Sequence, residues 1–175
     1  MAMAPSASIT DAAQLHEHLA TVFRSAVALG LVDHAGFAAT RLADGRIVTT
    51  PGTNSAGRFG RISPDDLIVV PGQPLHDSPP GVLPLELALA TVALGDEPGA
   101  TMILGAPDAL LMLSSVGRLP LPLAHTNAEL VHRGMRLIRL GGLALDPGHA
   151  RDLLAQAGSS PTVVLAGHAI LVSGP

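Results

Sequence analysis

Apolar residues near the start of the chain recur with the period of an α-helix. Five of them follow one another at spacings of three or four: Leu15, Leu19, Val22, Ala26 and Leu29. Thr10 before them and Gly30 after them are residue types that are typical of helix ends. The pattern predicts an amphipathic helix between Thr10 and Gly30. Residues 1–9 carry no such pattern, and we expect them to form a flexible tail.

Short apolar runs bounded by turn residues then predict strands. Phe37–Leu42 and Ile47–Thr50 flank Asp44-Gly45, a dipeptide that is typical of a two-residue hairpin turn. The other predicted strands are Leu67–Val70, Thr101–Leu104, Met135–Arg139 and two runs within Val163–Val172, on either side of Gly167-His168.

Proline marks the start of several further helices. Helices are predicted from Pro84 to about Leu94, from Pro107 to about Val116, around Asn127–Val131, and from Asp146-Pro147 through Ala155. Because helices alternate with strands while a hairpin comes early, we expect an α/β fold with a mixed central sheet flanked by helices. Residues 10–175 form one domain in this interpretation.

The residue types that the chain lacks exclude several mechanisms. There is no Cys, Tyr or Trp, and all ten basic residues are Arg. Thiolate catalysis and a Schiff-base lysine are therefore excluded, and acid/base chemistry must use His, Asp, Glu, Arg, hydroxyls, backbone groups or water.

Charge and hydropathy bear on partners and location. The formal net charge is −4 and no basic patch is present, so we expect neither a nucleic-acid partner nor a polybasic membrane anchor. The N-terminus lacks the pattern of a signal peptide, and the longest apolar stretch, Val82–Leu94, is too short to span a bilayer. We expect a cytoplasmic protein.

Several segments, in order, carry a resemblance that runs from about Leu15 to the C-terminus. The main ones are Leu-Gly-Leu-Val-Asp-His-Ala-Gly at 29–36, Arg-Ile-Ser-Pro-Asp-Asp-Leu-Ile-Val-Val at 61–70, Leu-Pro-Leu-Glu-Leu-Ala-Leu at 83–89 and Val-Leu-Ala-Gly-His at 164–168. Together they resemble the class II aldolase/adducin family. The resemblance implies a C-terminally shortened α/β/α fold and a homo-oligomer, with the tetramer as the usual form in the family.

The resemblance also implies where a metal would be bound. Members of the family hold a divalent metal with a His-x-His pair at the end of a strand and a third histidine further on. The pair corresponds here to Leu104 and Ala106, whereas the third histidine corresponds to His168. Because a catalytic metal needs about three protein ligands, we expect no metal and no other cofactor.

Other functional positions of the family are also changed. Its catalytic Glu corresponds to Val82, its phosphate-binding serines to Pro80 and Gly81, and a strand Asn to Phe37. These changes predict a fairly apolar, non-phosphorylated small-molecule substrate. Phe37, Leu104 and Ala106 are the expected lining of its binding site.

Three polar residues are candidates for catalysis, each with a plainer alternative. His168 is either a general base or hydrogen-bond donor, or a structural histidine. Glu86 is the only charged residue in its apolar helix and is either a carboxylate in the cleft or a solvent-facing side chain. Asp108 follows Pro107 and is either catalytic or placed to stabilise the N-terminus of a helix.

Further polar residues are candidates for substrate binding. Arg41 is either an anion-binding group or an exposed arginine at the end of a strand. His125 and Asn127 correspond to a His and a catalytic Asp of epimerase members of the family, but an Asn cannot act as a base.

The sequence therefore leads to one preferred function and two alternatives. The preferred hypothesis is a metal-independent lyase, isomerase or cyclase of bacterial specialised (natural product) biosynthesis. The first alternative is a non-catalytic protein that serves as a partner subunit or ligand-binding protein. The second is an atypical metal site built from His168 with His125 or Glu86.

Overall fold

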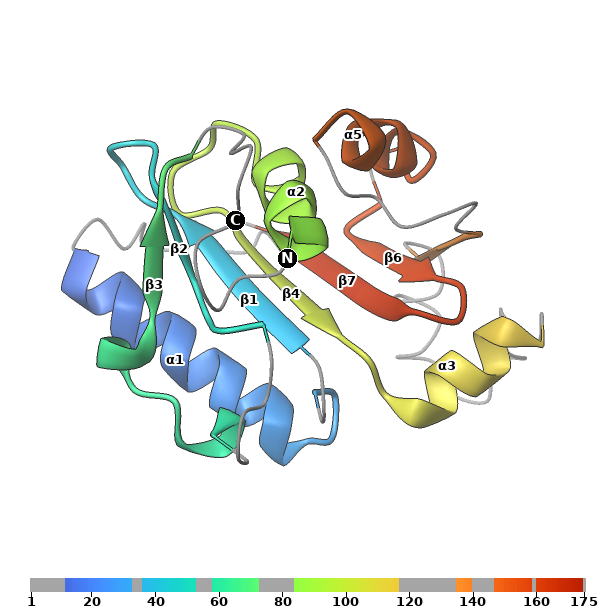
Figure 1. The fold of residues 1–175 in the computed structure, drawn as a ribbon, viewed down its shortest axis with the longest axis horizontal. Coiled ribbons are helices and arrows are strands. Elements are labelled where there is room, and N and C mark those ends of the chain that lie inside the picture. The colour runs from blue at the N-terminus through green and yellow to red at the C-terminus, as the bar shows by residue number, and fades with distance from the viewer. Residues whose placement is uncertain are drawn as a thin grey trace, which may run out of the picture.

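The central feature of the molecule is a seven-stranded sheet with the strand order β3-β2-β1-β4-β7-β6-β5 (Figure 1). The computed structural model describes residues 12–32, 36–52, 58–72, 84–116, 135–139, 147–158 and 160–174. The strands are β1 (Gly36–Arg41), β2 (Ile47–Thr49), β3 (Ile68–Val70), β4 (Thr101–Gly105), β5 (Met135–Ile138), β6 (Thr162–Leu165) and β7 (Ala169–Gly174). Only β5 and β6 pair in parallel among the described strands, so the sheet is mixed, as predicted.

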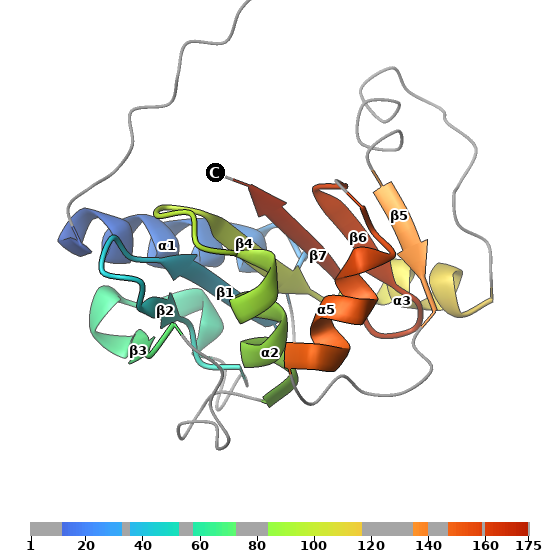
Figure 2. The same cartoon turned by 90° about the horizontal axis from the view of Figure 1, so that it is seen from above.

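Helices cover both faces of this sheet. They are α1 (Ala12–Ala28), α2 (Pro84–Ala93), α3 (Asp108–Ser115) and α5 (Pro147–Ala155), with short 3-10 helices η2 (Phe59–Arg61) and η3 (Pro64–Asp66). Seen from above, α2 and α5 lie on one face and α1 on the other (Figure 2). This α/β/α arrangement confirms the predicted fold class. The predicted helix around Asn127–Val131 and the predicted tail lie outside the described residues.

Alternating side chains of the strands build a separate core on each face. In β1, Phe37 and Ala39 join the core under α2 and α5, while Ala38 joins the core under α1. All six residues of β1 are buried, because the strand is central and both of its faces are covered. The two 3-10 helices, which the sequence pattern did not predict, belong to the α1 side, where Phe59 packs edge-on against Phe23.

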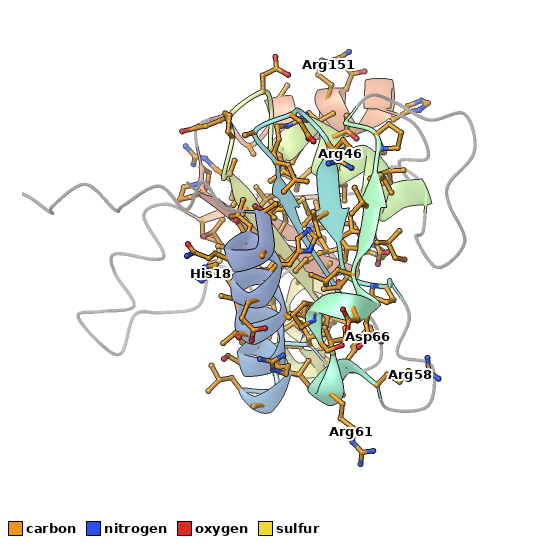
Figure 3. The ribbon with its side chains drawn as sticks, turned by 90° about the vertical axis from the view of Figure 1, so that its left-hand side faces the viewer. His18, Arg46, Arg58, Arg61, Asp66 and Arg151 are labelled. Atoms are coloured by element: carbon orange, nitrogen blue, oxygen red, sulfur yellow. The ribbon has the colours of Figure 1, made fainter. Side chains whose placement is uncertain are left out.

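Charged and other polar side chains lie mainly on the outside of these layers. His18 projects from α1, and Arg58 and Arg61 project from the segment around η2 (Figure 3). Within the ranges that the structure covers, no helix is both long and apolar enough to cross a membrane.

Glycines allow the end of α1 to pack closely on one edge of the sheet. A Cβ atom at Gly105, the last residue of β4, would collide with the carbonyl oxygen of Leu31, and one at Gly36 would collide with the side chain of Val32. The segment after α1 therefore closes one face of the sheet where β4 ends.

Candidate functional site

The pairing of β4 with β7 brings His168 to the end of β4. Leu104 pairs with Leu171 and Gly105 with Ile170. His168 directly precedes β7, and Ala106 directly follows β4, so both lie at the same edge of the sheet. Paired strands are about 5 Å apart. His168 precedes Ile170, the partner of Gly105, by two positions, so its backbone lies just past Ala106 and roughly 10 Å along the strand from Leu104. This end of β4 is the candidate site.

His168 lies in the tight turn that joins β6 to β7. Its backbone N–H donates to the carbonyl of Leu165 at 2.9 Å, and Gly167 before it adopts a left-handed conformation with φ of 70°. The imidazole is half-buried, and this burial lowers the pKa of His168 below its ordinary value of 6.5. A neutral imidazole at neutral pH can accept a proton, as a general base must.

Helix α3 holds this turn from the side. The hydroxyl of Ser114 accepts a hydrogen bond from the Gly167 N–H at 3.0 Å and donates one to the Leu111 carbonyl at 3.0 Å. Ser114 is only 3% exposed. Sequence reasoning missed this contact, because the two residues are 53 positions apart and a serine near a helix end has no distinctive signal.

The apolar residues of the edge are packed more tightly than expected. Phe37 and Leu104 are cross-strand partners, and they are 0% and 4% exposed within the core under α2 and α5. They offer a ligand almost no surface in this conformation, whereas we expected them to line a cleft. Ala106 is partly exposed and is the aliphatic position of the edge that a ligand could contact.

The two carboxylate candidates have opposite environments. Glu86, in the first turn of α2, is 4% exposed, so the solvent-facing alternative is wrong. Asp108 is the first residue of α3 and is exposed. Pro107, the N-cap residue of α3, has no side-chain acceptor for the free N–H groups of the first turn. The negative charge of Asp108 in that turn stabilises the helix through its dipole.

Arg41 lies at the opposite edge of the sheet. It follows Thr40, which pairs with Thr101 at the start of β4, whereas His168 lies at the end of that strand. Strand β4 alone spans roughly 14 Å, and the register puts both residues beyond its ends, so they are further apart than that. Arg41 is 5% exposed, and its guanidinium donates to the Gly45 carbonyl at 2.7 Å. The expectation of an exposed strand-end arginine is wrong, and so is its grouping with the residues around His168.

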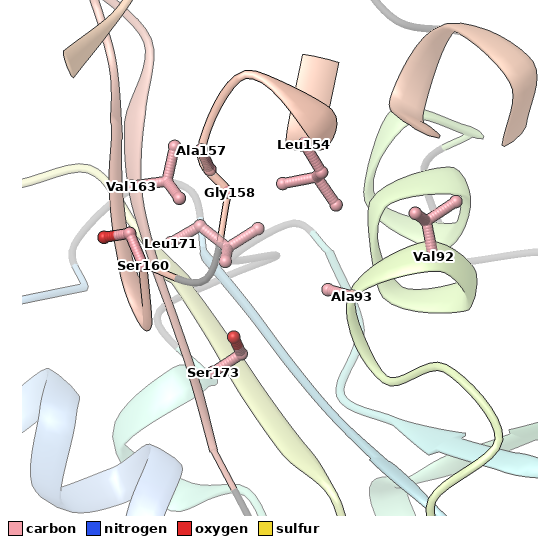
Figure 4. A pocket seen from close by; sticks show the side chains of 9 residues that line it. All are labelled: Val92, Ala93, Leu154, Ala157, Gly158, Ser160, Val163, Leu171 and Ser173. Atoms are coloured by element: carbon pink, nitrogen blue, oxygen red, sulfur yellow. The ribbon is translucent and has the colours of Figure 1, made fainter. Parts of the chain in front are cut away.

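A separate cavity of about 180 Å³ opens between α2 and α5, over β6 and β7 (Figure 4). It reaches Ser173, which pairs with Met102 near the start of β4, so it lies away from His168. Val163 and Leu171 on its floor are each only 1% exposed. A ligand there would bury little additional apolar surface, which makes this cavity a poor candidate for the site.

Comparisons with known proteins match this chain through its structure. No model of a known protein family matches the sequence, and no curated protein does. An aldolase II superfamily protein from Pseudomonas syringae superposes with a TM-score of 0.76 at 18% identity, covering 96% of this chain and 68% of that one.

Two structures of named enzymes show the same likeness. The L-fuculose-1-phosphate aldolase from Thermus thermophilus superposes with a TM-score of 0.70 at 18% identity, over 93% of this chain and 80% of its own. A sugar-phosphate aldolase from Thermotoga maritima gives 0.65 at 14% identity, over 92% and 84%. The chain has the class II aldolase fold.

Within the class II aldolase fold, the candidate edge does not fit a metal. The resemblance assigns the ligand pair to Leu104 and Ala106, which carry no donor atoms, and leaves one imidazole, that of His168. The described ranges hold no group of three His, Cys, Asp or Glu that could bind an ion. His125 and Asn127 lie outside the described residues, so an atypical set that includes His125 stays a prediction.

Proposed function

We propose that this chain is a metal-independent lyase, isomerase or cyclase that acts on a fairly apolar, non-phosphorylated small molecule. The observation that supports the proposal is the strand register, which brings the backbone of the half-buried His168 to the aliphatic end of β4. His168 would act as a general base, since its lowered pKa keeps the imidazole neutral at neutral pH.

The packing at this end of β4 favours positioning over electrostatic activation. On one face the carbonyl of Leu31 closes over Gly105, and on the other the side chain of Leu104 is part of the core. Among the described residues, no charged group is identified beside the imidazole. Most of the rate acceleration would therefore have to come from binding the substrate in a reactive conformation. Good orientation alone can lower a barrier by about 7–11 kcal/mol. Among reaction types, an intramolecular cyclisation or a proton shift is accelerated most by such orientation.

The two aldolases compared above are named for sugar-phosphate substrates, and our proposal departs from them. The resemblance assigns the phosphate-binding serines to Pro80 and Gly81, which have no side-chain donor. We therefore propose a substrate without phosphate, taken from bacterial specialised metabolism, and a cytoplasmic homo-oligomer as the working form.

The test combines metal analysis with turnover. The purified protein is incubated with Zn²⁺, Fe²⁺ or Mn²⁺, desalted and analysed for bound metal, and candidate intermediates from the pathway of the neighbouring genes are assayed by mass spectrometry. We expect less than one-tenth of an ion per chain, turnover that survives EDTA, and a loss of at least 100-fold in His168→Ala. A stoichiometric ion, or unchanged turnover in His168→Ala, would overturn the proposal.

The filled strand end favours a second candidate, a non-catalytic ligand-binding protein or partner subunit. Phe37 and Leu104 already occupy the place where a substrate would contact the strand. This candidate predicts binding of an intermediate without chemical change, in the wild-type chain and in His168→Ala alike.

A further inference from the structure

A buried hydroxyl connects the turn that carries His168 to the helix that follows β4. Ser114 donates to the Leu111 carbonyl inside α3, which fixes the direction of its hydroxyl hydrogen. A lone pair of the same oxygen then accepts the Gly167 N–H at 3.0 Å. With only 3% of Ser114 exposed, water has little access to replace this bond.

The imidazole is placed by its backbone and not by a polar contact of its ring. Across the described residues, no hydrogen bond or ion pair involves the ring of His168. Its position therefore follows from the backbone of the turn. That backbone is fixed by three bonds. The Ala166 N–H donates to the Ile138 carbonyl at 2.8 Å, the His168 N–H to the Leu165 carbonyl, and the Gly167 N–H to the Ser114 hydroxyl, which is the only side-chain acceptor of the three.

The turn also has little room to move toward α3. A Cβ atom at Gly167 would lie 2.9 Å from the Oγ of Ser115, closer than such atoms normally approach. The left-handed conformation of Gly167 further disfavours any residue with a side chain. The geometry thus has a specific acceptor, a matching donor and a close steric fit.

We propose that Ser114 is a positioning residue that sets the place of the His168 imidazole through the Gly167 backbone. Its value for catalysis rests on the proposed function of His168, but the positioning itself can be measured without a substrate. Helix α3 follows directly from the strand end of the site through Pro107, so the same segment determines where Ala106 lies and where His168 lies.

The experiment compares Ser114→Ala with Ser115→Ala. Ser115 is the matched control, because its exposed hydroxyl donates to the same Leu111 carbonyl and lies near Gly167, but makes no hydrogen bond to the turn. Two quantities are measured by NMR on the full chain: the hydrogen-exchange rate of the Gly167 amide and the pH titration of the His168 ring. Circular dichroism checks that both variants fold.

In Ser114→Ala we expect the Gly167 amide to exchange about tenfold faster, because it has lost its acceptor. We also expect the pKa of His168 to rise toward its ordinary value, since a looser turn exposes the ring to water. In Ser115→Ala we expect exchange within about twofold of the wild type and an unshifted titration. Equal exchange in Ser114→Ala and wild type would overturn the proposal, and so would faster exchange with an unchanged His168 titration.

A second variant keeps the test decisive if Ser114→Ala fails to fold. Gly167→Ala leaves the hydroxyl in place but pushes the turn away from Ser115, and it should shift the His168 titration in the same direction. An unshifted titration in a folded Gly167→Ala chain contradicts the proposal. These readouts are separate from turnover. If His168 does not contribute to turnover, the proposed function is refuted, but the measured effect of Ser114 on the position of His168 still holds.

Discussion

The polar side chains at the two ends of β4 differ in their hydrogen-bond partners. At its start, the hydroxyl of Thr40 donates to the Ala100 carbonyl and accepts from Thr101, both at 3.1 Å. Arg41 donates to the Gly45 carbonyl through one terminal guanidinium nitrogen, while its buried Nε has no hydrogen-bond partner among the described residues. At its end, the imidazole of His168 has no polar partner within the described ranges and is held only through its backbone. Buried polar groups that serve the fold are normally satisfied. The bonded hydroxyl of Thr40 contributes to stability, whereas under the proposed function the half-buried imidazole of His168 is the group that a ligand would meet.

The largest effect expected is the gain of a metal site at the second end. The double substitution Leu104→His and Ala106→His restores a His-x-His pair beside His168, and we expect it to bind about one Zn²⁺ per chain where the wild type binds none. Isothermal titration calorimetry measures the affinity. Adding His168→Ala to the double variant removes one of the three ligands and should weaken zinc binding at least 100-fold. No zinc binding in a folded double variant would mean that the register does not bring these side chains together.

The next effect is a difference in stability between the two ends. Thr40→Val removes a hydroxyl that is 1% exposed and bonded on both sides, at a cost of about 1–2 kcal/mol in the free energy of unfolding. The carbonyl of Ala100 still accepts the Arg41 N–H, which keeps the loss from being larger. His168→Gln should change the free energy by less than about 0.5 kcal/mol. Urea denaturation measures the unfolding free energy of both variants. Equal losses would contradict the proposed difference between the two ends of β4.

The smallest effect is a dependence of stability on pH that belongs to His168 alone. Burial lowers the folded-state pKa of this histidine below the 6.5 of the unfolded chain, so the unfolded state binds the proton more tightly. The contribution of His168 is fully present above pH 6.5 and is lost as the pH falls below it toward the folded pKa. Between about pH 7.5 and about pH 5.5, the unfolding free energy should therefore fall more in the wild type than in His168→Gln. An identical fall in unfolding free energy in both chains would mean that the imidazole of His168 is fully solvated in the folded state.

Sequence patterns predicted the sheet because its local signals agree with its tertiary contacts. Gly30 and Gly45 have the positive φ angles that the helix end and the hairpin require. The antiparallel pairing of β1 with β2 around Asp44-Gly45 then follows from turn chemistry alone. The resemblance predicted the class II aldolase fold, and the structural comparison confirms it.

Other features depend on distant contacts that no local pattern records. Helix η2 forms where Phe59 meets Phe23 of α1. Arg41 is buried because Gly45 and Gly72 lie over its guanidinium. A Cβ atom at Gly72 would collide with that guanidinium. Glu86 is buried because α2 packs against both β4 and α5. The Ser114–Gly167 bond exists only after α3 meets the β6–β7 turn.

The strand order has a consequence for how the chain assembles. Strand β7 comes late in the sequence but is central in the sheet, between β4 and β6. Its residue Gly174 pairs with Thr101 of β4. During synthesis, β3-β2-β1-β4 and β5-β6 can form only as two separate ribbons, each with an open edge toward the other. Strand β7 joins the two ribbons, so both edges stay open until β7 has been made and has paired with β4 and β6.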